Sequence, residues 1–497
     1  MKRVRRLNPG SQPVDRAASL IVPIPTMDDT TTDSPIRGIY KLPIEITQEI
    51  AGYLSDQDVC ALGASCRHFK LIIDDNSFWF KRFHATFDPS SIYIVKSGVT
   101  NAEDVKDKLK LLYQDRQKRL RGTAFMTGEF RSREKRVIRL LAELIRESYN
   151  GKPLFDSNGL LTCNNIEVLK EYAKNTELLE IFSPSKYSQK YNSGLAAIQL
   201  MCTSMCFDAD LGLHNWNFNL SQKYCYMTAI EAPVFTNADK TMVNVEWLLH
   251  VVNFFKYHAT NEDERTLFEP FQSLDTLEKP AMWTRSVKDN GGKLGKNWKG
   301  TYAYLDRDQM RLMRRAIEDD DDSMVIIDHN IDHGEKAIQT LELDYPGDHP
   351  RFKWPTKFED SLGSRSVEYP PTPVQHNINN TNPPPKNTTA IFFEGEGYDN
   401  EEYLAAGWLN PLPEQEGIPG WMRVTMMKYF DDQQGGWHTN ALWAYEGVVL
   451  PGGHIMLGRW WNPEEPAPGV YVGPFIFWDV DASVGDDDDS DMTDSEH

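Results

Sequence analysis

The sequence predicts an α+β protein with three short N-terminal helices, a helical middle region and a C-terminal antiparallel β-rich domain, barrel or sandwich-like. Helical periodicity dominates from about residue 101 to 255. After about residue 280, short stretches rich in aromatic and β-branched residues recur between turn formers. The 497 residues are 40% hydrophobic and 25% charged, which is near the globular average and allows roughly two to four domains.

The composition divides the chain into folded and unfolded segments. Residues 1–36 mix basic residues with Pro, Ser, Thr and Asp and should form a flexible arm. Folded segments are expected at 38–88, 100–280 and 281–484. A Pro- and Asn-rich stretch at about 366–389 should be a mobile insertion, and the acidic residues 485–497 a disordered tail.

The segment 38–88 predicts three short helices. The first should begin near Pro43, because Pro suits the first turn of a helix. Its apolar side chains recur at i, i+4, i+7 and i+8 and share one face, namely Ile46, Ile50, Tyr53 and Leu54. Ser55 and Asp58 predict the cap of a second helix, with apolar positions at Val59, Leu62, Cys66 and Phe69. A third helix follows from Ser77 and carries Phe78, Trp79 and Phe83.

Helices of this size share only a small core, and so small a domain is marginal by itself. The apolar side chains expected to remain uncovered are Leu42, Pro43, Ile46 and Leu54. An exposed apolar patch of this kind usually marks an interaction site. The alternative is a buried helical hairpin that belongs to a larger domain.

The same positions carry a family resemblance. The pattern Leu42-Pro43-x-Glu45, an Ile-spaced helix, Leu54-x-x-x-Asp58, Leu62, Cys66-Arg67-x-Phe69 and Trp79 resembles the F-box, over about one tenth of the chain. The resemblance implies binding to a Skp-family adaptor and, through it, to a cullin-RING ubiquitin ligase. Carried onto the matching positions, it implies adaptor contacts for Leu42, Pro43, Ile46, Ile50, Leu54, Leu62 and Trp79.

Apolar periodicity predicts helices in the middle region. One run contains Leu109, Leu112 and Tyr113, and a second contains Val137, Ile138, Leu140, Leu141, Leu144 and Ile145. Further helices are expected over Ile166–Tyr172 and Val243–Tyr257. The last of these has one broad apolar face with a polar seam.

Antiparallel strands are expected where turn signals such as Gly435-Gly436 and Pro451-Gly452-Gly453 separate apolar stretches. The candidate strands are Trp298–Leu305, Ser323–Asp328, Ala390–Phe393, Trp421–Phe430, Trp443–Leu450, Ile455–Trp461 and Val470–Trp478.

The stretches Gly417–Phe430, Trp443–Gly453 and Gly458–Trp461 look like the C-terminal region of fungal F-box proteins. That resemblance implies a substrate-binding region and no defined chemistry. Trp anchors recognition surfaces, and Arg can hold a carboxylate bidentately. The candidate target-binding residues are Trp421, Arg423, Trp443, Arg459 and Trp460. The alternative is that these Trp side chains fill a barrel interior, since alternation puts about half of them on any one face.

Composition also limits the class of partner and the compartment. A formal net charge of -20 argues against nucleic-acid binding, which depends on clustered Lys and Arg. No apolar run approaches the ~18 residues of a membrane span, and no secretory signal is expected. The six cysteines are sparse, which fits a reducing compartment, cytoplasm and/or nucleus. The cluster Lys2, Arg3, Arg5 and Arg6 is either a nuclear-import signal or a solvated end.

An enzyme is the rival class of function. A metal-dependent oxygenase or hydrolase in the C-terminal domain would use His438, His454 or the cluster from Asp328 to His333. A zinc site from Cys202, Cys206, Cys225 and His214 would lack a second close ligand pair.

The sequence has no phosphate-binding Gly loop with Lys and no Gly-x-Ser-x-Gly elbow. We therefore expect no catalytic residue, metal or cofactor, and an interaction protein that serves as the substrate receptor of a ligase. An F-box protein acting outside a ligase is the third possibility. The target and its degron are not identifiable from the sequence.

Overall fold

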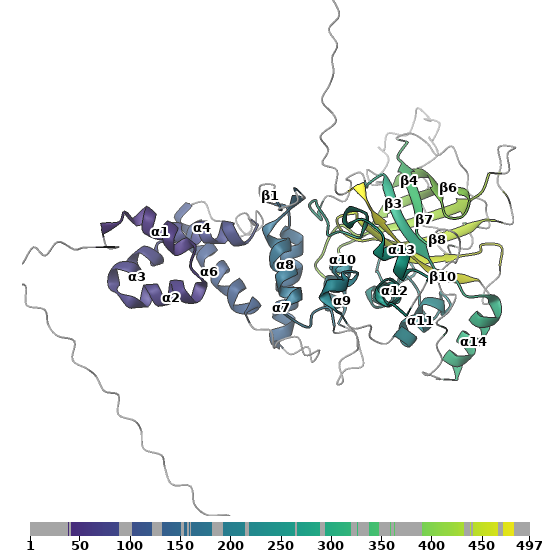
Figure 1. Ribbon diagram of the computed structural model, residues 1–497, viewed down its shortest axis with the longest axis horizontal. Helices are drawn as coiled ribbons and strands as arrows, with labels where there is room; N and C mark the ends of the chain where they lie inside the picture. The colour runs from purple at the N-terminus through teal and green to yellow at the C-terminus, as the bar shows by residue number, and fades with distance from the viewer. Residues whose placement is uncertain are drawn as a thin grey trace, which may run out of the picture. The chain divides into compact units, whose positions relative to one another are not determined.

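The computed structural model describes the chain in two compact units, Met1–Asp74 and Asp75–His497 (Figure 1). The described residues are 38, 41–88, 102–121, 132–150, 154–156, 159, 161–180, 192–213, 218–263, 266–288, 294–319, 326, 337–346, 358, 362, 390–431, 438, 441–465 and 471–481. The predicted arm, the insertion at 366–389 and the acidic tail lie outside these residues. The predicted α+β class is confirmed, and the C-terminal domain is a closed antiparallel barrel.

The described residues of the first unit form three helices, α1 (Ile44–Gly52), α2 (Asp56–Ser65) and α3 (Arg67–Asp74). Ser55 caps α2 as predicted, since its side chain accepts a hydrogen bond from the backbone N–H of Asp58 at 3.2 Å. The prediction of one helix from Val59 to Phe69 is wrong. Extended backbone at Cys66 (φ -160, ψ 163) divides it into α2 and α3, so the region 38–88 has four helices, with α4 (Asn76–Thr86) in the second unit.

Helices form the first part of the second unit, and the predicted helical runs are all found there. They are α4, α6 (Ala102–Leu120), α7 (Ser132–Glu147), α8 (Asn164–Lys174), α9 (Ser193–Met201), α10 (Thr203–Cys206), η3 (Ala209–Leu211), α11 (Phe218–Tyr226), α12 (Val245–Thr260), α13 (Phe268–Gln272) and η4 (Thr276–Glu278), with a short hairpin of β1 (Leu154–Phe155) and β2 (Leu161–Thr162). α12 is buried along nearly its whole length and packs against α9, α11, β9 and β10. It therefore joins the helical part to the barrel.

The barrel is an up-and-down meander that closes on itself. Its strands are β3 (Asn297–Tyr302), β4 (Gln339–Asp344), β5 (Ile391–Tyr398), β6 (Glu402–Pro411), β7 (Met422–Tyr429), β8 (Trp443–Val449), β9 (Ile455–Trp461) and β10 (Val472–Asp479). Each strand pairs antiparallel with its neighbour in sequence, and β10 pairs with β3 to close the ring. Helix α14 (Arg307–Glu318), which the sequence pattern did not predict, lies in the chain between β3 and β4.

Side-chain alternation fills the barrel interior. Along β7, Met422, Val424 and Met426 point into the interior cluster, and the residues between them point outward. Helices α11 and α12 pack on β10 and α12 also packs on β9, so these strands are buried on both faces. Because both of its faces are covered, β10 consists of an almost continuous run of apolar residues.

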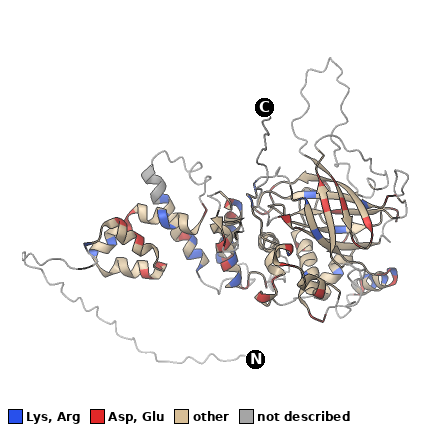
Figure 2. Ribbon diagram, turned by 45° about the horizontal axis from the view of Figure 1, so that its top comes forward, with Lys and Arg blue, Asp and Glu red and all other residues tan. Residues whose placement is uncertain are grey.

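The outer face of β4 and β5 is acidic. Glu342 lies directly opposite Glu396, and Asp344 lies directly opposite Glu394. Red segments of the ribbon mark Asp and Glu on the barrel strands in Figure 2. Because like charges opposite one another are destabilising, this pair of strands carries repulsion that its apolar inner face must offset.

His250 predicts a pH dependence of stability. It is fully buried in α12, its ring stacks on Tyr224 at 4.0 Å between centroids, and Ser221 Oγ lies 3.1 Å from its Nδ1. Burial lowers the pKa of His250 to about 3. The unfolded chain therefore binds a proton below about pH 6.5 that the folded chain does not bind until about pH 3.

We expect the free energy of unfolding to fall by up to ~1.4 kcal/mol per pH unit between pH 6.5 and about 4 from this group. Urea unfolding at four pH values measures the slope. His250→Gln keeps a polar side chain but cannot titrate, so its slope should be smaller than that of the wild type. Equal slopes would contradict the assignment.

Candidate functional site

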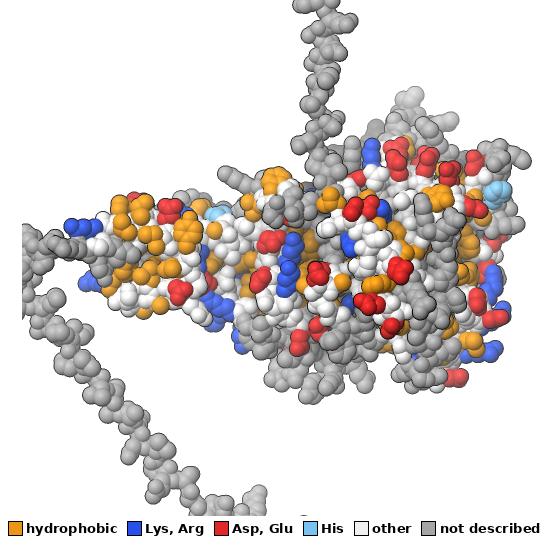
Figure 3. Space-filling model, viewed as in Figure 1, with side chains coloured by type: hydrophobic (Ala, Val, Ile, Leu, Met, Phe, Trp, Pro, Cys, Tyr) orange, Lys and Arg blue, Asp and Glu red, His pale blue; other side chains and the backbone are white. Residues whose placement is uncertain are grey.

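The first candidate site is an apolar face on α1. Ile46, Ile50 and Tyr53 lie on one side of the helix and are 43%, 41% and 86% exposed, and we call these three residues the α1 apolar face. Ile44 is 52% exposed as well, but it lies in the first turn on another side of the helix. Leu71 on α3 is exposed as well, and hydrophobic side chains gather over this unit in Figure 3. Exposed apolar groups in such a cluster mark a surface that another molecule covers.

The helix is held with its apolar side outward. Its buried residues are Thr47, Gln48 and Ala51. Thr47 Oγ1 donates a hydrogen bond to the Pro43 carbonyl at 3.2 Å, and Gln48 Nε2 donates to the Ile72 carbonyl at 3.3 Å. Because polar and small residues face the interior of the unit, the bulky side chains are left in solvent.

The second candidate site is a pocket in the barrel. It has a volume of about 270 Å³. Its lining residues are Tyr302, Tyr304, Asp399, Lys428, Phe430, Trp443, Tyr445, Trp460 and Tyr471. They come from strands β3 and β7 to β9, from residues next to the ends of β3, β7 and β10, and from the turn after β5. The pocket therefore forms only when the barrel closes.

Residues 39–85 match the family model described as F-box-like. The chain carries an F-box-like domain. The α1 apolar face lies within the matched residues. No curated protein and no solved structure matches the chain.

The predicted adaptor contacts of the F-box-like domain fall into three groups. Pro43, Ile46 and Ile50 are exposed, and Leu42, Leu54 and Leu62 are half-buried. Trp79 is buried in the second unit, where its ring packs against Tyr113 at 5.6 Å, so its indole offers little surface to an adaptor. Ile44, Tyr53 and Leu71 are exposed and were not in the predicted set, although Tyr53 shares the helical spacing of Ile46 and Ile50.

The predicted target-binding residues are divided by the barrel wall. Trp443 and Trp460 point inward and line the pocket. Trp421, Arg423 and Arg459 are buried elsewhere, which corrects the expectation that they form a groove with the other two. Trp421 donates a hydrogen bond from Nε1 to the Ile418 carbonyl at 3.0 Å and holds the turn before β7.

Arg423 and Arg459 are structural cations on the outer face of the barrel. Arg423 donates to Glu446 Oε1 from Nε at 3.0 Å and from Nη2 at 2.6 Å. The Arg459 guanidinium lies 4.9 Å from the Trp247 ring centroid, and burial lowers its pKa to about 10. Arg459 therefore links α12 to the barrel, whereas Arg423 joins β7 to β8.

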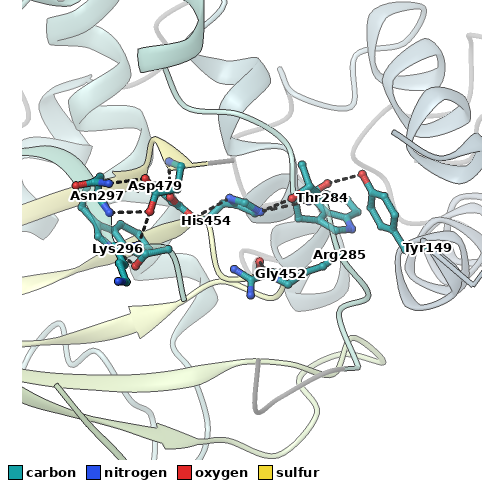
Figure 4. A network of polar contacts seen from close by, with 12 residues as sticks. Tyr149, Thr284, Arg285, Lys296, Asn297, Gly452, His454 and Asp479 are labelled. Carbon is teal, nitrogen blue, oxygen red and sulfur yellow. Dashed lines mark hydrogen bonds and ion pairs between the residues drawn. The ribbon is translucent and has the colours of Figure 1, made fainter. Parts of the chain in front are cut away.

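His454, a candidate metal ligand in the sequence, belongs to a network at one end of the barrel (Figure 4). The backbone N–H of Thr284 donates to its Nε2 at 3.2 Å, which leaves the ring proton on Nδ1, 3.4 Å from Asp479 Oδ2. Tyr149 donates from its hydroxyl to the Trp283 carbonyl at 3.0 Å. These contacts fasten the segment before β3 to the strands β9 and β10.

Replacing His454 by Ala should release this segment. We expect the Thr284 amide to exchange with solvent roughly tenfold faster or more, because one buried hydrogen bond of about 1–3 kcal/mol is lost. Hydrogen–deuterium exchange with mass spectrometry measures it. His438→Ala, at an exposed position, should leave that exchange unchanged, and an unchanged rate in both variants would contradict the role of His454.

Within the described ranges no cluster of three His, Cys, Asp or Glu side chains is arranged to hold a metal ion. Cys202 and Cys225 are fully buried, and burial raises the pKa of both thiols. His214 and the cluster from Asp328 to His333 lie outside the described residues. In the same ranges no helix is both long and apolar enough to span a membrane.

Proposed function

We propose that the chain is the substrate-recognition subunit of an SCF-type cullin-RING ubiquitin ligase. The F-box-like domain binds a Skp-family adaptor, and through it the cullin scaffold, while the second unit binds a target protein. The supporting observation is the α1 apolar face, which lies within the matched residues and is exposed. We further propose that the chain acts in the cytoplasm or nucleus, where such ligases meet their targets.

In this role the chain has no chemical step of its own. Ubiquitin transfer belongs to other subunits, and the receptor raises the effective concentration of a target lysine near the ubiquitin carrier. The buried ion pairs and the barrel give the second unit a fixed shape, which suits it to recognition.

The experiment that tests the proposal uses the full chain. Purified chain is mixed with a Skp-family adaptor and then with a cullin-RING scaffold, and each mixture is analysed by size-exclusion chromatography. We expect stoichiometric co-elution with the adaptor and then with both. Failure to co-elute with the adaptor would overturn the proposal, and co-elution with the adaptor alone would indicate an F-box protein that works outside a ligase.

A further inference from the structure

The barrel pocket has walls made almost entirely of aromatic rings. Of its lining residues, seven are aromatic, and four of these are Tyr302, Trp443, Trp460 and Tyr471. The Trp460 ring lies edge-to-face against the other three, at centroid distances of 5.9, 5.4 and 5.3 Å respectively. Trp460 Nε1 donates a hydrogen bond to the Ala303 carbonyl at 3.1 Å, which fixes this central ring. The walls are therefore formed before any ligand arrives.

The two charged side chains that line the pocket, Lys428 and Asp399, compensate each other's charge. Lys428 and Asp399 form a buried ion pair, and Asp399 Oδ1 also accepts hydrogen bonds from the backbone N–H groups of Asn400 and Glu401. The Lys428 ammonium lies 4.1 Å from the Tyr403 ring centroid, an additional favourable contact for a cation. Burial opposes ionisation of Asp399, but the neighbouring Lys428 and these hydrogen bonds lower its pKa. Both groups are therefore charged, and their charges cancel.

A neutral pocket discriminates against charged ligands. An anion that enters it loses its hydration and meets only the Lys428 charge, which Asp399 already compensates. A cation meets the Lys428 ammonium, which already lies over the rings of Tyr302, Tyr403 and Phe430 that would otherwise attract it. A neutral ring loses little hydration and can contact aromatic faces and edges in the offset or perpendicular arrangements that such rings prefer. The pocket should therefore bind neutral, planar groups in preference to charged ones.

The size of the pocket limits the ligand further. Its volume of about 270 Å³ is below the range of roughly 300–1,000 Å³ typical of sites for drug-sized molecules. One ring or two fused rings fit this space. Trp443 and Tyr471 are only half-buried, so the group can enter from solvent past them.

We propose that this pocket binds a single neutral aromatic group, presented either as the side chain of a peptide or as a small free molecule. The assignment of that group to a target protein rests on the proposed function, whereas the pocket's chemistry does not. If the chain is a receptor, the pocket recognises one aromatic residue of its target.

Isothermal titration calorimetry on the full chain tests the ligand class. The probes are three single-ring compounds of similar size: 4-methylphenol (neutral), benzoate (anionic) and benzylammonium (cationic). Indole extends the series to two fused rings. We expect the neutral probes to bind about tenfold or more tightly than the ions. Equal or tighter binding of either ion would overturn the proposal, as would failure of all probes to bind the folded chain.

Matched Trp variants locate the site. Trp443→Leu keeps an apolar side chain but removes the ring, and should weaken neutral-probe binding by about tenfold. Trp461→Leu is the control, because Trp461 packs with the outer cluster of the barrel and should leave binding unchanged. Circular dichroism checks that both variants fold, and Tyr471→Ala replaces Trp443→Leu if that variant does not. Unchanged binding in a folded pocket variant would overturn the site.

Short peptides distinguish the two sources of the ring. A glycine-rich pentapeptide with a central Trp is compared with the same peptide carrying a central Leu. Tighter binding of the Trp peptide than of indole identifies a peptide side chain, and binding of indole alone identifies a free small molecule. The same preparation is tested for co-elution with the adaptor. If the chain co-elutes with the adaptor but binds none of the aromatic probes, only this inference is overturned.

Discussion

Replacing Ile46 and Ile50 together by Asp is expected to abolish co-elution with a Skp-family adaptor. Both residues are more than 40% exposed and are not among the buried residues of α1, which are Thr47, Gln48 and Ala51. Burying a fully exposed apolar side chain contributes about 1.5–3 kcal/mol, and a side chain with about 40% of its surface left to bury contributes a corresponding part of it. Losing two, and placing two carboxylates against an apolar partner, should weaken binding by at least roughly a hundredfold. Biolayer interferometry with immobilised adaptor gives the two dissociation constants.

A matched control separates this effect from general damage. Leu312 on α14 is 49% exposed and lies in the second unit, so Leu312→Asp makes the same kind of change away from the F-box-like domain. We expect this variant to bind adaptor as the wild type does. Far-UV circular dichroism should be the same for all three proteins. A double Asp variant that folds and still binds adaptor would show that the α1 apolar face is not the interface.

Periodicity predicted the helices because their apolar positions repeat over several turns. In α7, Val137, Leu141 and Leu144 are all buried as the spacing requires. The helix break at Cys66 was not predicted, because apolar spacing continues across it from Leu62 to Phe69 while the backbone turns to an extended conformation. Spacing reports which side chains share a face only while the backbone stays helical.

Two strands and one helix of the barrel region were also missed. In β4, Leu341 and Leu343 alternate with exposed acidic residues, which is the period of a strand, but acidic residues have low strand propensity. β6 begins after a turn of only three residues that follows β5, and the sequence pattern did not distinguish it as a separate strand. In α14, Met310 and Met313 are buried at helical spacing, but the four arginines of the helix obscured the pattern.

The two candidate sites could be predicted from the sequence to different extents. The α1 apolar face has a helical spacing and a family pattern, and both can be read directly. In the barrel, alternation fixes which residues share a face but not what covers that face. Arg423 and Arg459 are candidate target-binding residues in the sequence, but they are buried on the outer side of the barrel, and Arg459 lies against Trp247 of α12. For Lys428, the sequence offers a single indication of a place in the pocket, which is a charged residue at a position that strand alternation directs into the barrel.

Replacing Glu446 by Gln is expected to lower the free energy of unfolding by about 3–5 kcal/mol, because removing one partner leaves buried cations uncompensated. Glu446 accepts hydrogen bonds from both Arg423 and Lys240, at 2.6 and 2.7 Å, and lies opposite Arg459 in the β8–β9 pairing. Burial alone already lowers the pKa of Lys240, and Glu446 opposes that shift. A neutral amide would leave three positive groups facing one another.

Equilibrium urea unfolding at neutral pH measures the loss, with Glu396→Gln as the control. Glu396 is exposed on β5 and lies directly opposite Glu342, so its neutralisation should leave stability unchanged or raise it by a few tenths of a kcal/mol. A Glu446→Gln variant as stable as the Glu396→Gln control would mean that solvent, rather than Glu446, compensates the charges of Lys240 and Arg423.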